Sequence, residues 1–187
     1  MKLEPAFLLH TCCAPCCGGI VESLLEKELP FTVFFYNPNI FPKNEYKKRK
    51  DDVVNFCNRT RTPFVDGDYE EGRWNDCIRG YENEPEKGKR CSLCFEFRLK
   101  STALFASQFG FSAIATTLGI SRQKDLTQVN NAGAKAVLDF PDIKFLPFDW
   151  RKDGGTERMK VVADREKFYK QNYCGCRFSL QRDRNTH

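Results

Sequence analysis

Short apolar runs alternate with longer amphipathic stretches from one end of the chain to the other. The runs are rich in β-branched and aromatic residues, which is typical of strands buried in a parallel sheet. We predict strands at residues 6–10, 31–36, 63–66, 112–116 and 143–147. Between the runs, apolar residues recur every three or four positions, as they do on the buried face of a helix. This spacing predicts helices at residues 18–29, 44–58, 70–79, 91–109, 125–138 and 156–171.

The regular alternation of strand and helix predicts an α/β fold with a doubly wound, mostly parallel sheet between two layers of helices. No internal repeat, linker or low-complexity stretch interrupts it, so residues 1–187 are expected to form a single domain. In such a sheet, the loops that leave the carboxyl ends of the strands meet at one edge, where ligands bind. Chemistry is therefore expected in the loops at residues 11–17, 37–42 and 117–124.

The composition is that of a globular protein with a modest basic excess. Of the 187 residues, 41% are hydrophobic and 13% are aromatic, which is enough for a sizeable core. The 30 basic and 25 acidic side chains leave a net charge of +5, which permits RNA binding without requiring it. Cations that form a rim around the ligand-binding edge of the sheet would bind phosphates. For each cation taken singly, the alternative is a place on a solvated charged face. The candidates are Lys43, Lys47, Lys48, Arg49, Lys50, Arg151, Lys152, Arg177 and Arg182.

No segment of the sequence has the pattern of a membrane span or a signal peptide. No run reaches the ~18 to 20 apolar residues of a transmembrane helix. The stretch from Met1 to Leu9 is too short for a signal peptide. We therefore expect a cytoplasmic protein with no membrane partner. In that reducing compartment, clustered cysteines are more often metal ligands or redox thiols than disulfide scaffolds.

Two pairs among the ten cysteines predict a metal site. Cys12 and Cys13 follow the first strand, and Cys91 and Cys94 form a C-x-x-C pair at a helix start, where the helix dipole favours thiolate. Zinc and iron–sulfur clusters both take four thiolates, so the spacing predicts a four-cysteine site without choosing the metal. A zinc clip or a thioredoxin-like pair is the alternative for Cys91 and Cys94 alone.

Cys174 and Cys176 form a C-x-C pair of a different kind. A disulfide between them would close a small, strained ring, and strained disulfides are the labile, redox-active ones. Gly175 gives such a ring the backbone freedom that it needs. The alternative is that both cysteines are further metal ligands or free thiols.

The other cysteines and the internal histidine carry less information. Cys57 and Cys77 lie in helical patterns and are expected to be small buried side chains, as is Cys17. The role of Cys16 is left open. His10 is either a tuning group or proton donor beside the cysteines, or a strand-end histidine with satisfied hydrogen bonds. No G-x-G-x-x-G or G-x-x-x-x-G-K-[ST] stretch supports a nicotinamide, flavin or P-loop site.

Five segments, in order along nearly the whole chain, resemble the QueH-type epoxyqueuosine reductases. They are HTCCAPC at 10–16, FYNPNI at 35–40, RCSLCF at 90–95, TTL at 116–118 and NYCGC at 172–176. The resemblance implies a Rossmann-like fold of the adenine-nucleotide hydrolase-like group and the reduction of epoxyqueuosine to queuosine in tRNA. It also implies a [4Fe–4S] cluster held by Cys12, Cys13, Cys91 and Cys94, with Cys174 and Cys176 as the redox-active pair.

The implied reaction removes an epoxide oxygen with two electrons and two protons and releases water. The implied partners are tRNA carrying epoxyqueuosine in its anticodon stem-loop and an electron donor of unidentified kind. An additional iron beside the cluster is left open. Cobalamin is not expected, because the chain lacks a D-x-H-x-x-G motif. Tyr36, Tyr81 and His10 are candidate proton donors by residue type.

Two other functions compete with this one. The first is a zinc-bound, non-catalytic tRNA-binding module, which the same four thiolates would suit. The second is an ATP-dependent tRNA sulfur-transfer enzyme on a related fold. That enzyme would need an S-G-G-x-D-S-like loop after the first strand, where this chain has cysteines instead.

Overall fold

The computed structural model describes residues 6–184, and in them the apolar runs form one sheet. Its strands are β1 Phe7–His10, β2 Phe31–Phe35, β3 Phe64–Asp66, β4 Ala113–Thr116 and β5 Lys144–Phe145. They lie in the order β3-β2-β1-β4-β5, and every neighbouring pair is parallel. The predicted α/β fold is confirmed, with each strand a little shorter than its apolar run.

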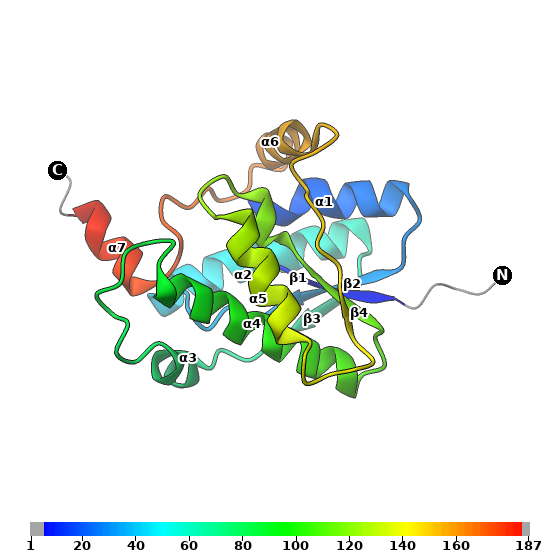
Figure 1. Ribbon diagram of the computed structural model, residues 1–187. Coiled ribbons are helices and arrows are strands. Elements are labelled where there is room, and N and C mark those ends of the chain that lie inside the picture. Colours follow the sequence, from blue (N-terminus) through cyan, green and yellow to red (C-terminus); the bar gives the residue numbers. More distant parts are fainter. Residues whose placement is uncertain (1–5, 185–187) are drawn as a thin grey trace.

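Helices connect the strands and follow the last one (Figure 1). They are α1 Ala14–Glu26, α2 Lys43–Thr60, α3 Glu71–Cys77, α4 Lys89–Gln108, the 3₁₀ helix η1 Thr117–Ile120, α5 Leu126–Ala136, α6 Gly155–Arg165 and α7 Arg177–Arg184. Helix α1 begins earlier than predicted, because Pro15 occupies its first turn, where a missing N–H costs no hydrogen bond. Helix α6 ends well before residue 171, since Lys167 adopts a positive φ of 55°. Helix α7 is an addition that the polar C-terminal sequence did not predict.

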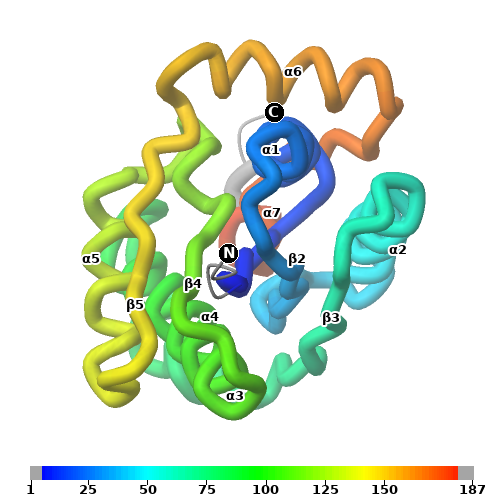
Figure 2. Tube along the Cα trace, turned by 90° about the vertical axis from the view of Figure 1, so that its right-hand side faces the viewer, coloured from blue at the N-terminus to red at the C-terminus, as the bar shows by residue number. Residues whose placement is uncertain are grey.

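Alternate strand residues face opposite sides of the sheet and build two apolar layers. Leu9 and Val33 belong to the layer that the sheet shares with α1 and α2. Leu8, Phe34 and Ile114 belong to the layer that it shares with α4. Figure 2 shows α1 and α6 on one side of the strands and α4 on the other. The three-layer arrangement predicted from the alternating pattern is therefore present.

The order in which strands are added to the sheet reverses next to β1. The chain runs outward from β1 to β3 on one side and then crosses to β4 and β5 on the other. Loops after two such strands diverge to opposite faces and leave a crevice at their carboxyl ends, where open α/β sheets bind ligands. The cysteine turn (residues 12–17) follows β1, and η1 follows β4, so both border this crevice. None of the described helices has the length and apolarity that a bilayer-spanning segment needs.

Candidate metal centre

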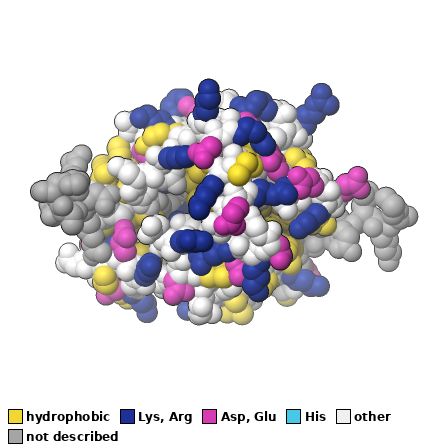
Figure 3. Space-filling model, turned by 90° about the horizontal axis from the view of Figure 1, so that it is seen from above, with side chains coloured by type: hydrophobic (Ala, Val, Ile, Leu, Met, Phe, Trp, Pro, Cys, Tyr) yellow, Lys and Arg dark blue, Asp and Glu magenta, His cyan; other side chains and the backbone are white. Residues whose placement is uncertain are grey.

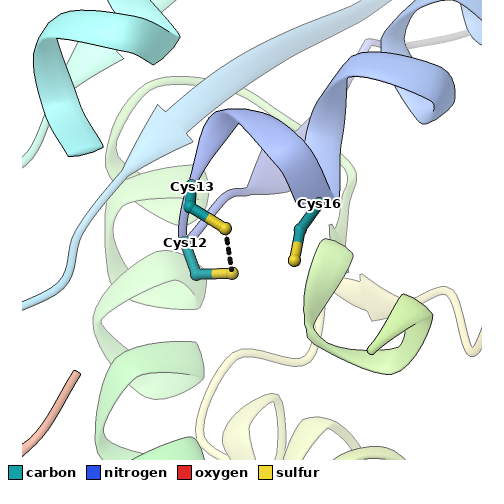
Figure 4. A group of neighbouring side chains, drawn as sticks. All are labelled: Cys12, Cys13 and Cys16. Atoms are coloured by element: carbon teal, nitrogen blue, oxygen red, sulfur yellow. Dashed lines mark hydrogen bonds between the residues drawn. The ribbon is translucent and has the colours of Figure 1, made fainter. Parts of the chain in front are cut away.

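Three cysteine thiols meet where β1 gives way to α1. Cys12 lies in the turn, Cys13 is the N-cap of α1, and Cys16 lies three residues further on in the first turn. Their sulfur atoms all lie within 4.8 Å of one another, and all three side chains are buried (Figure 4). Thr11, just before them, donates its backbone N–H to the carbonyl of Phe34 at 2.9 Å, which ties the turn to β2. Buried thiols this close together can ligate a soft metal.

The three thiols do not share negative charge equally. The Cys12 and Cys13 sulfur atoms are 3.7 Å apart. Hydrogen bonds from Cys13 and Cys16 lower the pKa of Cys12 well below its ordinary value, and the charges of Lys124 and Arg98 add to this. The bond with Cys12 conversely raises the pKa of Cys13 to about 12 and that of Cys16 well above its ordinary value. Of the three thiols, Cys12 is thus the one whose surroundings favour the thiolate.

The two other predicted ligands come from the beginning of α4. Cys91 is half-buried, and Cys94 is buried in a cluster with Trp74 and Cys176. Burial raises the pKa of both thiols, to about 12 for Cys94. Neither belongs to the group within 4.8 Å, which Cys16 completes instead. The structure thus brings half of the predicted four-cysteine set together and adds the thiol whose role the sequence left open.

A cavity of about 380 Å³ joins the cysteine turn to the C-terminal C-x-C pair. The thiols that line it are Cys12, Cys16, Cys91, Cys174 and Cys176. Cys174 is exposed and Cys176 is buried, so one thiol of the predicted redox pair is open to solvent and the other is shielded. The predicted pair and two of the predicted ligands therefore face one space, although they come from distant parts of the chain.

The C-G-C segment is held by α2 and by the loop after β2. Arg49 donates from Nη1 to the carbonyl of Cys174 at 3.2 Å and from Nη2 to that of Tyr173 at 3.3 Å. Its Nε forms a buried ion pair with Glu45 at 2.8 Å. Gly175 has a φ of +124°, which L side chains rarely adopt, and its carbonyl accepts a backbone N–H from the loop after β2 at 2.8 Å. The position of the predicted redox pair thus depends on residues far away in the sequence.

Sequence reasoning missed two polar side chains, one that contacts a cysteine of the site and one that braces the loop after β2. Gln171 donates from Nε2 to the sulfur of Cys13 at 3.0 Å. Arg98 is 2% exposed and donates to the side-chain oxygen of Asn37, which follows β2. A signal existed for Arg98, because it lies four residues after Cys94 and therefore on the same face of α4. Gln171 offered none, since it precedes an irregular segment whose path depends on tertiary packing.

The candidate proton donors are absent from the described lining of the cavity. His10 is fully buried, with Nδ1 at 2.9 Å from the Thr116 hydroxyl and Nε2 at 3.1 Å from the carbonyl of Tyr36. A carbonyl only accepts, so Nε2 donates to it, and Nδ1 accepts from the hydroxyl. Burial above all lowers the pKa of His10 to about 3. His10 is the strand-end histidine with satisfied hydrogen bonds. The Tyr36 hydroxyl donates to Glu70 at 2.6 Å, and Tyr81 is exposed.

Most cations of the predicted basic rim already have partners. Their ion pairs are Lys47–Asp51, Arg49–Glu45, Lys50–Asp66 and Arg177–Glu71. Arg151 donates to two backbone carbonyls, and the side chain of Arg182 lies outside the described part of the chain. On the face that carries α6, cations and carboxylates are also interspersed (Figure 3). Lys43, Lys48 and Lys152 are exposed. Fewer of the predicted cations are therefore available to bind phosphate than the sequence indicated.

The chain matches a known protein family over almost its whole length. The family model described as epoxyqueuosine reductase QueH matches residues 7–182. The epoxyqueuosine reductase QueH of Acinetobacter baylyi is 47% identical over 178 residues, which are 95% of this chain and 81% of that relative. The Haemophilus influenzae protein of the same name is 45% identical, over 95% of this chain and 72% of the relative. The Thermotoga maritima protein of the same name is 34% identical, over 96% of this chain and 93% of the relative.

A solved structure shares the fold. The U34-tRNA thiolase NcsA from Methanococcus maripaludis, with its [4Fe-4S] cluster, superposes with a TM-score of 0.56. The sequence identity is 14%, and the match covers 95% of this chain and 62% of that one. At this identity the likeness concerns the fold alone. The family match, by contrast, spans the cysteine turn, the C-x-x-C pair and the C-G-C segment together. On that match and those identities, the chain belongs to the epoxyqueuosine reductase QueH family.

Proposed function

We propose that this chain reduces epoxyqueuosine to queuosine in tRNA, as a cytoplasmic, cobalamin-independent enzyme with a single iron–sulfur domain. Membership of the family supports the reaction. The observation that carries the proposal is the cavity, because thiols from distant parts of the chain line one space of about 380 Å³. A reductase needs such a space, in which the oxygen to be removed lies next to the groups that supply electrons.

Within this proposal, Cys12, Cys13, Cys91 and Cys94 hold a [4Fe–4S] cluster. The site fits such a group in its donor chemistry, because its buried thiols are soft ligands. The amide N–H of Gln171 already points at a ligand sulfur, the kind of contact that tunes cluster potentials. Cys16, the third thiol of the group, is the residue to which an additional iron would bind. When bound, the cluster would carry electrons one at a time at low potential, and the thiol pair would be the source of the two that the reaction consumes.

The C-G-C pair can supply the two electrons and two protons that the reduction of the substrate consumes. Removing the oxygen of an epoxide to leave an alkene breaks two C–O bonds, consumes two electrons and two protons, and releases water. When Cys174 and Cys176 close to a disulfide, one S–S bond forms and the two thiols give up two electrons and two protons. An external electron donor then reduces the disulfide. Exposed Cys174 is the thiol that such a donor can reach.

The test is turnover of the natural substrate. Protein purified anaerobically is incubated with epoxyqueuosine-containing tRNA and a reductant, without cobalamin, and the digested nucleosides are analysed. We expect queuosine, and the same product from an anticodon stem-loop RNA that carries the modified base. No queuosine from protein with an intact cluster contradicts the proposal. Colourless protein that contains zinc and no iron supports the non-catalytic tRNA-binding module instead.

A further inference from the structure

Four cations line the cavity between the two groups of thiols: Arg49, Lys87, Arg90 and Lys124. Arg49 is engaged by a buried carboxylate and by the carbonyls of the C-G-C segment. Arg90 donates from Nη1 to two carbonyls of the preceding loop and lies 4.8 Å from the ring centroid of Phe178. Lys87 is exposed. Nε and Nη2 of buried Arg90 have no hydrogen-bond partner among the described residues, and Lys124 is the half-buried cation of the four.

Lys124 lines the same cavity as the thiols of Cys12, Cys16, Cys174 and Cys176. No carboxylate or carbonyl of residues 6–184 forms a hydrogen bond or ion pair with its Nζ. A lysine ordinarily carries its proton at neutral pH, so Lys124 brings a positive charge to the cavity that both groups of thiols line.

The backbone of Lys124 is fixed from two sides. Its own N–H donates to the carbonyl of Ser121 at 3.1 Å, which closes a turn after η1. Arg151 donates from Nη2 to the same carbonyl at 2.7 Å and to the carbonyl of Lys124 at 2.9 Å. The neighbouring Trp150 donates from Nε1 to the carbonyl of Thr116 at 2.8 Å, which ties this clamp to the end of β4. These hydrogen bonds hold the backbone of the loop, and with it the Cα of Lys124, in one position relative to the cavity, as a group that acts on a substrate requires.

We propose that Lys124 is a catalytic residue that binds the epoxide oxygen and stabilises the negative charge that gathers there as the C–O bonds break. The inference rests on the proposed function. Hydrogen bonds from an ammonium to an oxygen that becomes anionic strengthen along the reaction, so they lower the barrier as well as hold the substrate. Lys124 is neither oxidised nor reduced, because both electrons come from the thiol pair.

A role confined to balancing the charge of the thiolates predicts a different outcome. In that case a neutral side chain at position 124 weakens metal binding, and activity falls in proportion to iron content. If Lys124 acts on the substrate, iron content is unchanged and only kcat falls. Lys124→Met removes the charge from a side chain of similar length, whereas Lys124→Arg keeps the charge with a different geometry.

The experiment uses the anaerobically purified holoprotein. Iron and sulfide content, visible spectrum, affinity for epoxyqueuosine-containing tRNA, and kcat are measured for the wild type and both variants. We expect Lys124→Met to keep the iron content, spectrum and tRNA affinity but to lose about 10²–10³-fold in kcat, as enzymes do when an oxyanion donor is removed. Lys124→Arg should recover part of this loss. Lys160→Met, an exposed lysine on α6, is the matched control and should turn over like the wild type.

The possible outcomes separate this inference from the function on which it rests. If the wild type is active and Lys124→Met has the same kcat, the inference fails and the proposed function stands. A loss of iron that parallels the loss of activity also overturns the inference, because Lys124 then acts on the metal centre. An inactive wild type with an intact cluster removes the proposed function, and this inference with it.

Discussion

The cysteine turn at residues 12–17 and the C-G-C segment at residues 174–176 face the same cavity but are anchored differently. The turn continues the central strand β1, its four thiols are buried, and Cys13 begins α1. The C-G-C segment belongs to no strand and lies between α6 and α7. Its backbone is held by Arg49 and by the loop after β2, and Cys174 is exposed.

This difference suits two kinds of chemistry. Metal ligands work best when packing holds them in place before the metal arrives. Thiols that close to a disulfide must instead approach to about 2 Å and later meet a reductant, so they need room and access. Core packing provides the first condition, and a segment held by hydrogen bonds outside the sheet and helices permits the second. The cysteine turn is thus the fixed half of the site, and the C-G-C segment is the adjustable half.

Serine substitutions in the two halves should have the largest effects and should differ in kind. Cys12→Ser replaces a soft thiolate by a hydroxyl that binds iron poorly, so we expect loss of both cluster and activity. Cys176→Ser leaves the ligands intact but cannot form a disulfide, so we expect a wild-type cluster without turnover. Iron and sulfide content, the visible spectrum and queuosine formation measure both effects.

Cys77→Ala is the matched control for these variants, because Cys77 is half-buried in α3 and does not line the cavity. It should keep both the cluster and the activity. If Cys12→Ser and Cys176→Ser both retain cluster and activity, the assignment of the two halves is wrong. If Cys176→Ser loses the cluster, the C-G-C segment supplies ligands and the contrast between the halves disappears.

The next effect concerns the clamp on the adjustable half. Arg49→Lys keeps the ion pair with Glu45 but loses the fork that reaches the carbonyls of Tyr173 and Cys174. Two lost hydrogen bonds are worth about 1–3 kcal/mol, so we expect turnover to fall about tenfold and Cys174 to be alkylated about tenfold faster. Iron content should not change. Rates of alkylation at Cys174, followed by peptide mapping, and kcat measure the effect.

Arg59→Lys provides the comparison on the same helix. Arg59 pairs with Glu166 on the surface at 2.6 Å, and exposed pairs contribute little. It should match the wild type in both measurements. An Arg49→Lys protein with wild-type alkylation and turnover would show that other contacts suffice to hold the segment.

The sequence predicted the fixed half better than the adjustable half, for a physical reason. An apolar run followed by cysteines is a property of consecutive residues, and the alternation of strands and helices placed it correctly at the edge of a doubly wound sheet. The clamp joins residues 125 positions apart in the chain. Arg49 was assigned to a surface rim, although it is 3% exposed, because a charged helix does not reveal which arginine turns inward. Helix α7 was missed because its polar sequence depends on Phe178 packing near Trp74.

Hydrogen bonds beneath the fixed half should contribute to global stability. His10→Leu leaves the carbonyl of Tyr36 and the hydroxyl of Thr116 without their shared partner in the core. We expect a loss of about 1–3 kcal/mol, and hence a fall in the melting temperature of the holoprotein by about 3–8 °C. In a double-mutant cycle with Thr116→Val, the two losses should be less than additive, because the partners contact each other. An unchanged melting temperature, or strict additivity, contradicts this role.

The smallest global effect is expected from strain placed in the adjustable half. In Gly175→Ala, the alanine would have to adopt a φ of +124°. Its Cβ would lie 3.1 Å from Nη1 of Arg49 and 3.2 Å from Cγ1 of Ile40. Such strain costs about 1–3 kcal/mol, but a segment that belongs to no strand or helix relieves it by opening locally. We therefore expect the melting temperature to stay within about 1 °C, while Cys174 is alkylated several-fold faster. Gly110→Ala is the control, since Gly110 also has a positive φ, of 77°, with nothing near its Cβ position, and it should not alter the thiol. If Gly175→Ala instead lowers the melting temperature as far as His10→Leu does, the C-G-C segment unfolds together with the core and both halves of the site are equally fixed.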